Sequence, residues 1–235
     1  MVSERMRIAL AAMPVRDVLG LAGLCAASAH IGEVSGAGIM LMTDDVQRGS
    51  LSTTDEVSAT VEDLQYELRE GPCVDAYRQQ QTVLEPDLAG PVTPRWASFT
   101  PAALDAGVRA IFGFPLGVGQ VHLGALNLYR DRAGPLSAVQ QQDCEEMADL
   151  IGVALLDLQS HAEAGEVAVE LDAGANLQPH VHQASGMVAA QAGVSVSAAV
   201  TLLRVRALAD GERLAETADR VIGREIRFDQ PDLAR

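Results

Sequence analysis

The segment 176–235 constrains the fold more than any other part of the chain, because its pattern predicts three short helices that pack against one another through small residues. Apolar and alanine residues recur there at helical spacing, as between Val181 and Val188. Gly193 and Gly211 follow the first two predicted helices, where glycine commonly ends a helix. Aromatic residues make up only 3% of the chain, so the core must come mainly from smaller apolar side chains. We therefore expect an all-α, three-helix domain in this segment.

Residues 1–160 mix strand and helix patterns. The compact apolar run 36–42 predicts a buried strand, and Gly117-Val-Gly119 suits a hairpin between two further runs. The predicted strands are 36–42, 50–54, 110–116 and 122–129, and the predicted helices are 4–31, 62–70, 74–80, 96–106 and 137–162. This mixture predicts an α+β domain with a central antiparallel sheet flanked by helices. The small, acidic segment 161–175 is interpreted as a linker to the second domain, residues 176–235.

The charge of the chain limits its partners. The formal net charge is −15, and all of the basic residues are arginines. Residues 1–165 hold 10 basic and 22 acidic residues, and the remainder holds 7 and 10, so the acidity is concentrated in the first domain. An acidic balance disfavours non-specific binding to phosphate backbones, so we expect no DNA partner. It leaves open a contact with RNA through a local arginine stripe.

Cysteine and histidine spacing gives no support for a metal centre. Cys25, Cys73 and Cys144 are an odd number without metal-ligand spacing, which favours reduced thiols in the cytoplasm. His180 and His182 point in different directions on a helix, and no further ligand pair lies nearby. We therefore expect neither a metal nor a cofactor. No apolar run reaches the roughly 18 residues that a membrane-spanning helix needs, so no membrane partner is expected.

A set of short motifs in the first domain points to a family of sensor domains. The motifs are Leu64-Gln65, Glu70-Gly-Pro-Cys-Val-Asp-Ala76, Asp87-Leu88, Trp96, Gly107-Val-Arg109, Phe114-Pro-Leu116 and Gly124-Ala-Leu-Asn-Leu-Tyr129. With them, residues 10–160 resemble a GAF domain. The resemblance implies a small-molecule sensor or a dimerisation platform, with an unknown small molecule as partner. The residues expected at its pocket are Met40, Cys73, Trp96 and Phe112.

Small and apolar positions in the second domain also follow a family pattern. They are Ala184, Gly186, Ala199, Leu203, Arg204, Ala207, Leu214 and Ala218. Together they resemble the ANTAR module, an RNA-binding domain of bacterial transcription antiterminators. The resemblance implies that the module holds tandem stem-loops in a nascent transcript, which keeps a terminator from forming. Three positions depart from the pattern: Ser185 stands where a lysine is usual, Ala198 where an acidic residue is frequent, and Val200 where an aromatic residue is frequent.

Arginines dominate the expected RNA surface. Four of them are spaced seven, four and three residues apart, which predicts one face of a helix: Arg213, Arg220, Arg224 and Arg227. A guanidinium group binds phosphate bidentately and can stack on an unpaired base. The other residues expected at the RNA are Arg204, Arg206, His182 and Ser185. The alternative is a solvated face with salt bridges inside the helix, because Glu216 lies four residues before Arg220.

Two other functions stay open. The first is a dimeric small-molecule-binding or protein-interaction module that does not bind RNA, which Ser185, Val200 and the net acidity favour. The second is a thiol-dependent enzyme, because Cys73 follows Gly71-Pro72 near a predicted helix start, where a thiol pKa could be lowered. A free cysteine is more often a small buried apolar residue, so we expect no enzyme.

The long helix predicted after Ser137 could join two copies of the chain. Its apolar face contains Val139, Cys144, Met147, Ile151, Ala154, Leu155 and Leu158. This stripe exceeds what covering one small sheet requires, so we expect a homodimer through paired long helices. Such pairing would let a stimulus in the sensor change the spacing of two ANTAR modules.

Overall fold

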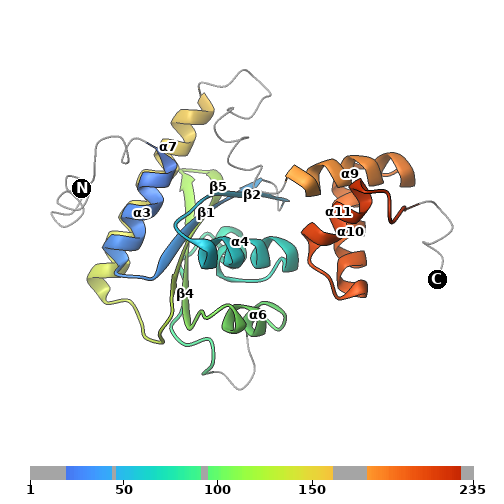
Figure 1. Ribbon diagram of the computed structural model, residues 1–235. Helices are drawn as coiled ribbons and strands as arrows, with labels where there is room; N and C mark the ends of the chain where they lie inside the picture. The colour runs from blue at the N-terminus through green and yellow to red at the C-terminus, as the bar shows by residue number, and fades with distance from the viewer. Residues whose placement is uncertain (1–19, 44–45, 91–94, 161–178, 229–235) are drawn as a thin grey trace. The chain divides into compact units, whose positions relative to one another are not determined.

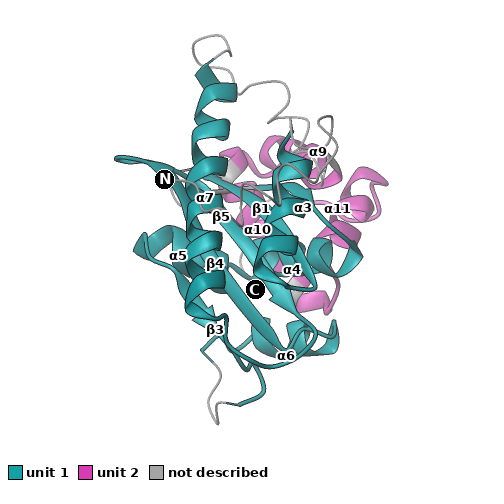
Figure 2. Ribbon diagram, turned by 90° about the vertical axis from the view of Figure 1, so that its left-hand side faces the viewer, with its two compact units in different colours: residues 1–177 teal, residues 178–235 magenta. Residues whose placement is uncertain are grey.

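The computed structural model describes residues 20–43, 46–90, 95–160 and 179–228 (Figure 1). The chain divides into two compact units, residues 1–177 and 178–235, which are described one at a time (Figure 2). The predicted linker 161–175 lies outside the described residues. Within the described ranges, no helix is both long and apolar enough to cross a membrane.

The first unit is built on a five-stranded antiparallel sheet with the strand order β2-β1-β5-β4-β3. The strands are β1 (Gly36–Thr43), β2 (Val46–Thr53), β3 (Val83–Glu85), β4 (Ala110–Val118) and β5 (Val121–Arg130). The predicted α+β class with a central antiparallel sheet is confirmed. β5 lies in the middle of the sheet, and its residues from Gly124 to Arg130 are buried.

Two layers of helices cover the sheet (Figure 1). The helices are α3 (Leu21–Gly32), α4 (Glu56–Leu68), α5 (Pro72–Gln79), α6 (Phe99–Asp105) and α7 (Ala138–Ser160). α3 and α7 pack on one face, where Ile39, Phe112 and Leu126 form part of the larger core. α4, α5 and α6 pack on the other face, where Ile111 and Tyr129 belong to a second core. Because side chains alternate along a strand, neighbouring residues of β1, β4 and β5 enter different cores.

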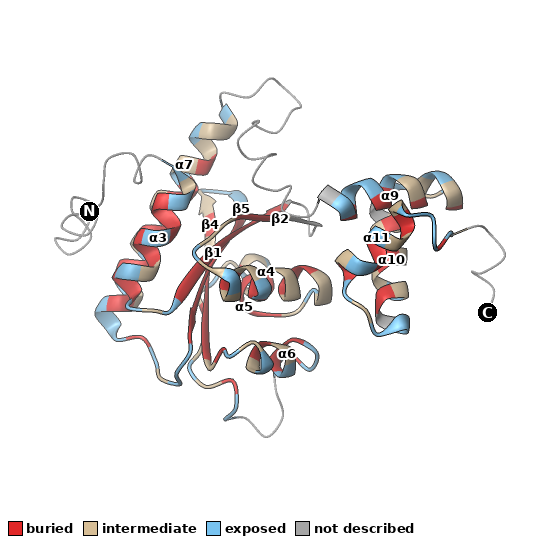
Figure 3. Ribbon diagram, viewed as in Figure 1, coloured by how far each residue is buried: buried red, intermediate tan, exposed pale blue. Residues whose placement is uncertain are grey.

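The apolar stripe of α7 is used inside its own unit. Cys144, Met147, Ile151 and Leu155 are buried in the core with α3 and the sheet. The last turns of α7, which are drawn clear of α3 in Figure 3, are mostly half-buried or exposed. The exposed side carries Gln142, Glu145, Asp149, Val153 and Asp157. Most of the stripe expected to pair two copies is therefore buried against α3 and the sheet of the same unit.

The second unit consists of α9 (Pro179–Ala192), α10 (Val196–Asp210) and α11 (Leu214–Ile222). Gly193 and Gly211 follow the first two helices with φ of 67° and 68°, a left-handed conformation that favours glycine. The Ser195 hydroxyl accepts a hydrogen bond from the Ala198 N–H at 3.2 Å and so caps α10. The core is made of small side chains: Val181, Ala184, Val188, Ala199, Leu203, Ala207, Leu214, Ala218 and Val221. The predicted three helices are present.

Candidate functional site

The four arginines expected on one helix face do not share a helix. α11 ends at Ile222, and Arg224 has a φ of 61° in the left-handed region. The Glu225 N–H returns to the Arg220 carbonyl at 2.8 Å, so the chain turns away from the helix axis. Arg213 precedes the first turn of α11, and Arg227 lies beyond its end. The prediction of a single arginine face was wrong, because the spacing alone did not locate the end of the helix.

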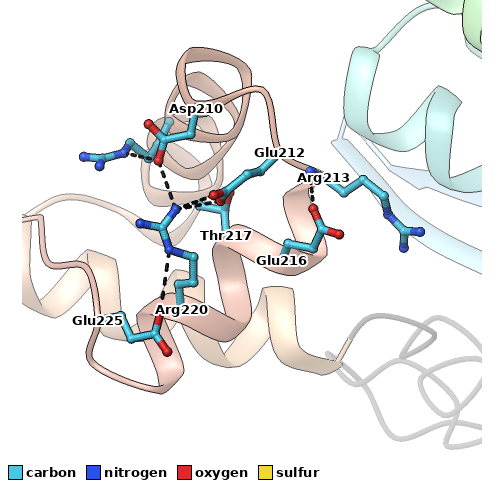
Figure 4. Close-up of polar contacts among 8 residues, drawn as sticks. Asp210, Glu212, Arg213, Glu216, Thr217, Arg220 and Glu225 are labelled. Carbon is cyan, nitrogen blue, oxygen red and sulfur yellow. Dashed lines mark hydrogen bonds and ion pairs between the residues drawn. The ribbon is translucent and has the colours of Figure 1, made fainter.

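Arg220 is held by acidic residues of its own unit (Figure 4). Its Nη1 lies 2.7 Å from Glu212 Oε1 and 3.1 Å from Asp210 Oδ2. The hydrogen bond to Glu212 raises the pKa of Arg220, and the hydrogen bond to Asp210 raises it to a smaller extent. Arg206 donates to the same Asp210 at 2.8 Å and lowers the pKa of that carboxyl. These contacts join α10, the following loop and α11, so the charges of Arg206 and Arg220 are already paired.

Glu216 does not pair with Arg220. Its Oε2 accepts a hydrogen bond from the backbone N–H of Arg213 at 3.0 Å, which satisfies a donor at the start of α11. In Figure 4 the Arg213 side chain extends away from the Arg220 group, which consists of Arg206, Asp210, Glu212 and Arg220. Among the described residues, neither Arg213 nor Arg224 has an acidic partner, and both side chains are exposed. These two cations are therefore available to a phosphate.

The other expected RNA residues differ in exposure. Ser185 is fully buried, and its hydroxyl donates to the His182 carbonyl at 2.8 Å. It cannot contact RNA in this structure, because it faces the core of the three-helix unit beside Ala184. His182 is exposed, Arg204 is half-buried on α10, and Arg227 is exposed.

The four residues expected at the GAF pocket do not gather at one place. Phe112 belongs to the core between the sheet and α3 and α7, under the guanidinium of Arg130. Met40 alternates with Ile39 and therefore faces the layer of α4 and α5. Placing Phe112 at the same pocket was wrong, because strand alternation sends it to the opposite face.

Trp96 connects α5 and α6. Its Nε1 donates to Asp75 Oδ2 at 3.0 Å, and its ring meets Phe99 edge-on. Arg95 pairs with the same Asp75 at 2.9 Å. Glu70 accepts from the Ser98 N–H at 2.8 Å and so caps the start of α6. Glu70 and Asp75, two residues of the family pattern, therefore hold α5 and α6 in place through hydrogen bonds and an ion pair.

Cys73 lies at the buried start of α5. Gly71 has a φ of 126°, and the Cys73 N–H donates to Gln65 Oε1 at 2.8 Å. Burial, followed by the nearby Glu62, raises the pKa of the Cys73 thiol well above its usual range. Burial likewise raises the pKa of Cys25 and of Cys144 to about 12. A thiol kept neutral is a poor nucleophile, so these environments do not favour thiol chemistry.

Two polar side chains that the sequence analysis missed lie on the same face as Met40. Glu62 on α4 is 1% exposed and Asn127 on β5 is 0% exposed. Burial raises the pKa of Glu62 to about 8, although the neighbouring Asn127 amide lowers it in part. A signal existed in the sequence, because Asn127 interrupts the apolar run of its strand.

Comparison with known proteins identifies the first unit. Residues 17–156 match the GAF domain family. The GAF domain of an Acinetobacter phosphoenolpyruvate-protein phosphotransferase is 11% identical, with a TM-score of 0.51, over 68% of this chain and 96% of that chain. The GAF domain of the Coxiella burnetii phosphoenolpyruvate-protein phosphotransferase is 12% identical, with a TM-score of 0.49, over 67% of this chain and 94% of that chain.

The first of these structural likenesses shows a shared fold and, at such low identity, nothing about the ligand. No curated protein matches the chain. The family match ends before the second unit begins. Because that match covers more than half of the sequence, the chain belongs to the GAF domain family.

Proposed function

We propose that the chain is a signal-responsive RNA-binding regulator acting by transcription antitermination. Its GAF unit would respond to a small ligand or a redox signal, and its C-terminal unit would bind tandem stem-loops as an ANTAR module. The observation that carries the proposal is the core of the second unit. Six of the eight residues that suggested the ANTAR resemblance fill it, because they are buried: Ala184, Ala199, Leu203, Ala207, Leu214 and Ala218. Gly186 is exposed and Arg204 is half-buried. The buried positions support the module's fold more directly than they support an RNA contact.

The contact with RNA would rest on a smaller surface than the full arginine set. Arg213, Arg224 and His182 are exposed, whereas Arg206 and Arg220 are engaged with acidic residues. Phosphate binding gains from cations that are not already neutralised. We therefore assign the first contacts to Arg213 and Arg224.

The proposal is tested by titrating the full chain with a tandem stem-loop RNA at two salt concentrations. Arg213→Ala combined with Arg224→Ala should weaken binding and reduce the salt slope by about 1 for each lost phosphate contact. Arg206→Ala is the matched control, because it removes an arginine that already pairs with Asp210. Equal losses in the control and the double variant would refute this assignment of the contacts.

The second candidate is a small-molecule-binding or protein-interaction module that does not bind RNA. One observation favours it: residues 179–228 hold six arginines against five acidic residues, and the Arg220 group neutralises part of that charge. Failure of the wild-type chain to bind the RNA at low salt, with and without a GAF ligand, would select this candidate. Because the three thiols are buried with raised pKa values, we propose no enzymatic function.

A further inference from the structure

A line of three residues crosses the sheet beneath α4 and α5. In the strand register, Asn127 of β5 stands opposite Gly38 of β1 on one side and Gly113 of β4 on the other. A Cβ at Gly38 would lie 2.4 Å from Glu62 Oε1, and a Cβ at Gly113 would lie 2.5 Å from the Pro72 carbonyl oxygen. The two glycines therefore let the Glu62 carboxyl and the start of α5 descend onto the sheet beside Asn127.

The polar groups brought together there have little in the described part of the chain to bind except each other, because the Asn127 amide is the group that lowers the pKa of Glu62. Among the described residues, both carboxyl oxygens of Glu62 and both polar atoms of Asn127 lack a hydrogen bond of good geometry. The charged side chain that acts on Glu62 is Asp63, which has the same sign. Burying such groups without hydrogen bonds of good geometry is unfavourable.

We infer that Glu62 and Asn127 form the recognition end of a ligand site in the GAF unit, and that the ligand presents a planar cation with paired N–H donors, an amidinium or a guanidinium. A carboxylate accepts two parallel N–H bonds from such a group, and the Asn127 amide adds one acceptor and one donor. Met40, two residues along β1 from Gly38, lies on the same face of the sheet and is buried. The inference rests on the proposed sensing function and gives it a ligand class.

Binding of this class has a distinctive proton balance. Without a ligand, the Glu62 carboxyl keeps its proton at neutral pH, since its pKa is about 8. An amidinium or guanidinium pairs with the carboxylate, so the carboxyl proton leaves to solvent as the cation binds. Affinity should then rise with pH up to about 8. A neutral ligand would not require the Glu62 carboxyl to lose its proton, so its affinity would not rise with pH in this way.

The test is calorimetric titration of the full chain with acetamidine, benzamidine and agmatine, each in two buffers of different ionisation enthalpy. We expect at least one compound to bind with release of close to one proton at neutral pH. Glu62→Gln should weaken that binding by about tenfold or more, as expected for a lost charged hydrogen-bonded pair. Glu56→Gln is the matched control, because it removes an exposed carboxyl of the same helix.

Three results overturn the inference: no binding by any of the compounds, binding without proton release, or equal affinity in Glu62→Gln. Glutamine has the shape of the protonated carboxyl, so the variant should fold, and its melting curve checks this. The wild-type proton count decides the question even where the variant is unstable. Stem-loop binding is measured separately, so RNA binding with no amidinium response removes this inference and leaves the proposed function standing.

Discussion

At the scale of single residues, Glu62 makes the stability of the GAF unit depend on pH. Its pKa is raised to about 8 in the folded chain from an ordinary value of 4.5, so the folded state holds the proton more tightly than the unfolded state. The resulting stabilisation is complete below the unfolded pKa and is lost as pH rises through the folded pKa. Wild-type stability should fall by roughly 1 kcal/mol per pH unit within this window.

Glu62→Gln should remove this fall, because glutamine does not titrate. Urea unfolding of both proteins across the window measures the difference, and the variant should be the more stable one near pH 8. Glu56→Gln, on the exposed side of the same helix, should keep the wild-type slope. Parallel curves for wild type and Glu62→Gln would mean that the carboxyl is already ionised in the fold.

The residue line under α4 gives a second prediction at this scale. Gly38→Ala would place its methyl group 2.4 Å from Glu62 Oε1 and 2.8 Å from Glu62 Cγ, so α4 or the carboxyl must move. We expect a loss of about 1–3 kcal/mol in the free energy of unfolding. Gly186→Ala is the control, because a Cβ there meets nothing within 4 Å and α9 gains a better helix former. A Gly38→Ala protein as stable as the wild type would show that Glu62 does not pack on this glycine.

At the scale of elements, periodicity predicted which segments form helices and strands and left their faces and ends uncertain. The start of α4 was predicted at residue 62, whereas Asp55 caps the helix by accepting from the Ser58 N–H at 2.8 Å. That cap was readable in the sequence. The sequence alone did not show which residues face which core. Phe112 faces one core and Asn127 the other, and this depends on a register between strands that are distant in sequence. The Arg220 group likewise joins residues from separate elements.

The α7 helix carries a prediction that separates core from interface. Ile151→Asp should unfold the GAF unit, because it buries a charge at a fully buried position. Val153→Asp should leave its stability nearly unchanged, because Val153 is 55% exposed. If the exposed side of α7 joins two copies, the second variant alone should convert a dimer to a folded monomer in sedimentation. A Val153→Asp protein that remains dimeric would exclude this side of α7 as the interface.

At the scale of the whole molecule, the proposal requires that the two units influence each other. Residues 161–178 join them and lie outside the described part of the chain. Coupling between the units would appear as a change in binding affinity. A ligand of the GAF unit that changes RNA affinity must have its own affinity changed by RNA by the same factor. Coupling of this kind commonly amounts to about 5- to 150-fold.

This reciprocity is measured with the amidinium compound that binds best and the tandem stem-loop RNA. We expect Glu62→Gln to abolish the effect of the compound on RNA binding while leaving RNA affinity in its absence unchanged. Arg213→Ala with Arg224→Ala should do the reverse, weakening RNA binding while leaving affinity for the compound intact when RNA is absent. Equal RNA affinity with and without saturating compound, in a wild-type chain that binds both, would show two independent binding units. In that case the chain would not be a regulator controlled by this class of ligand.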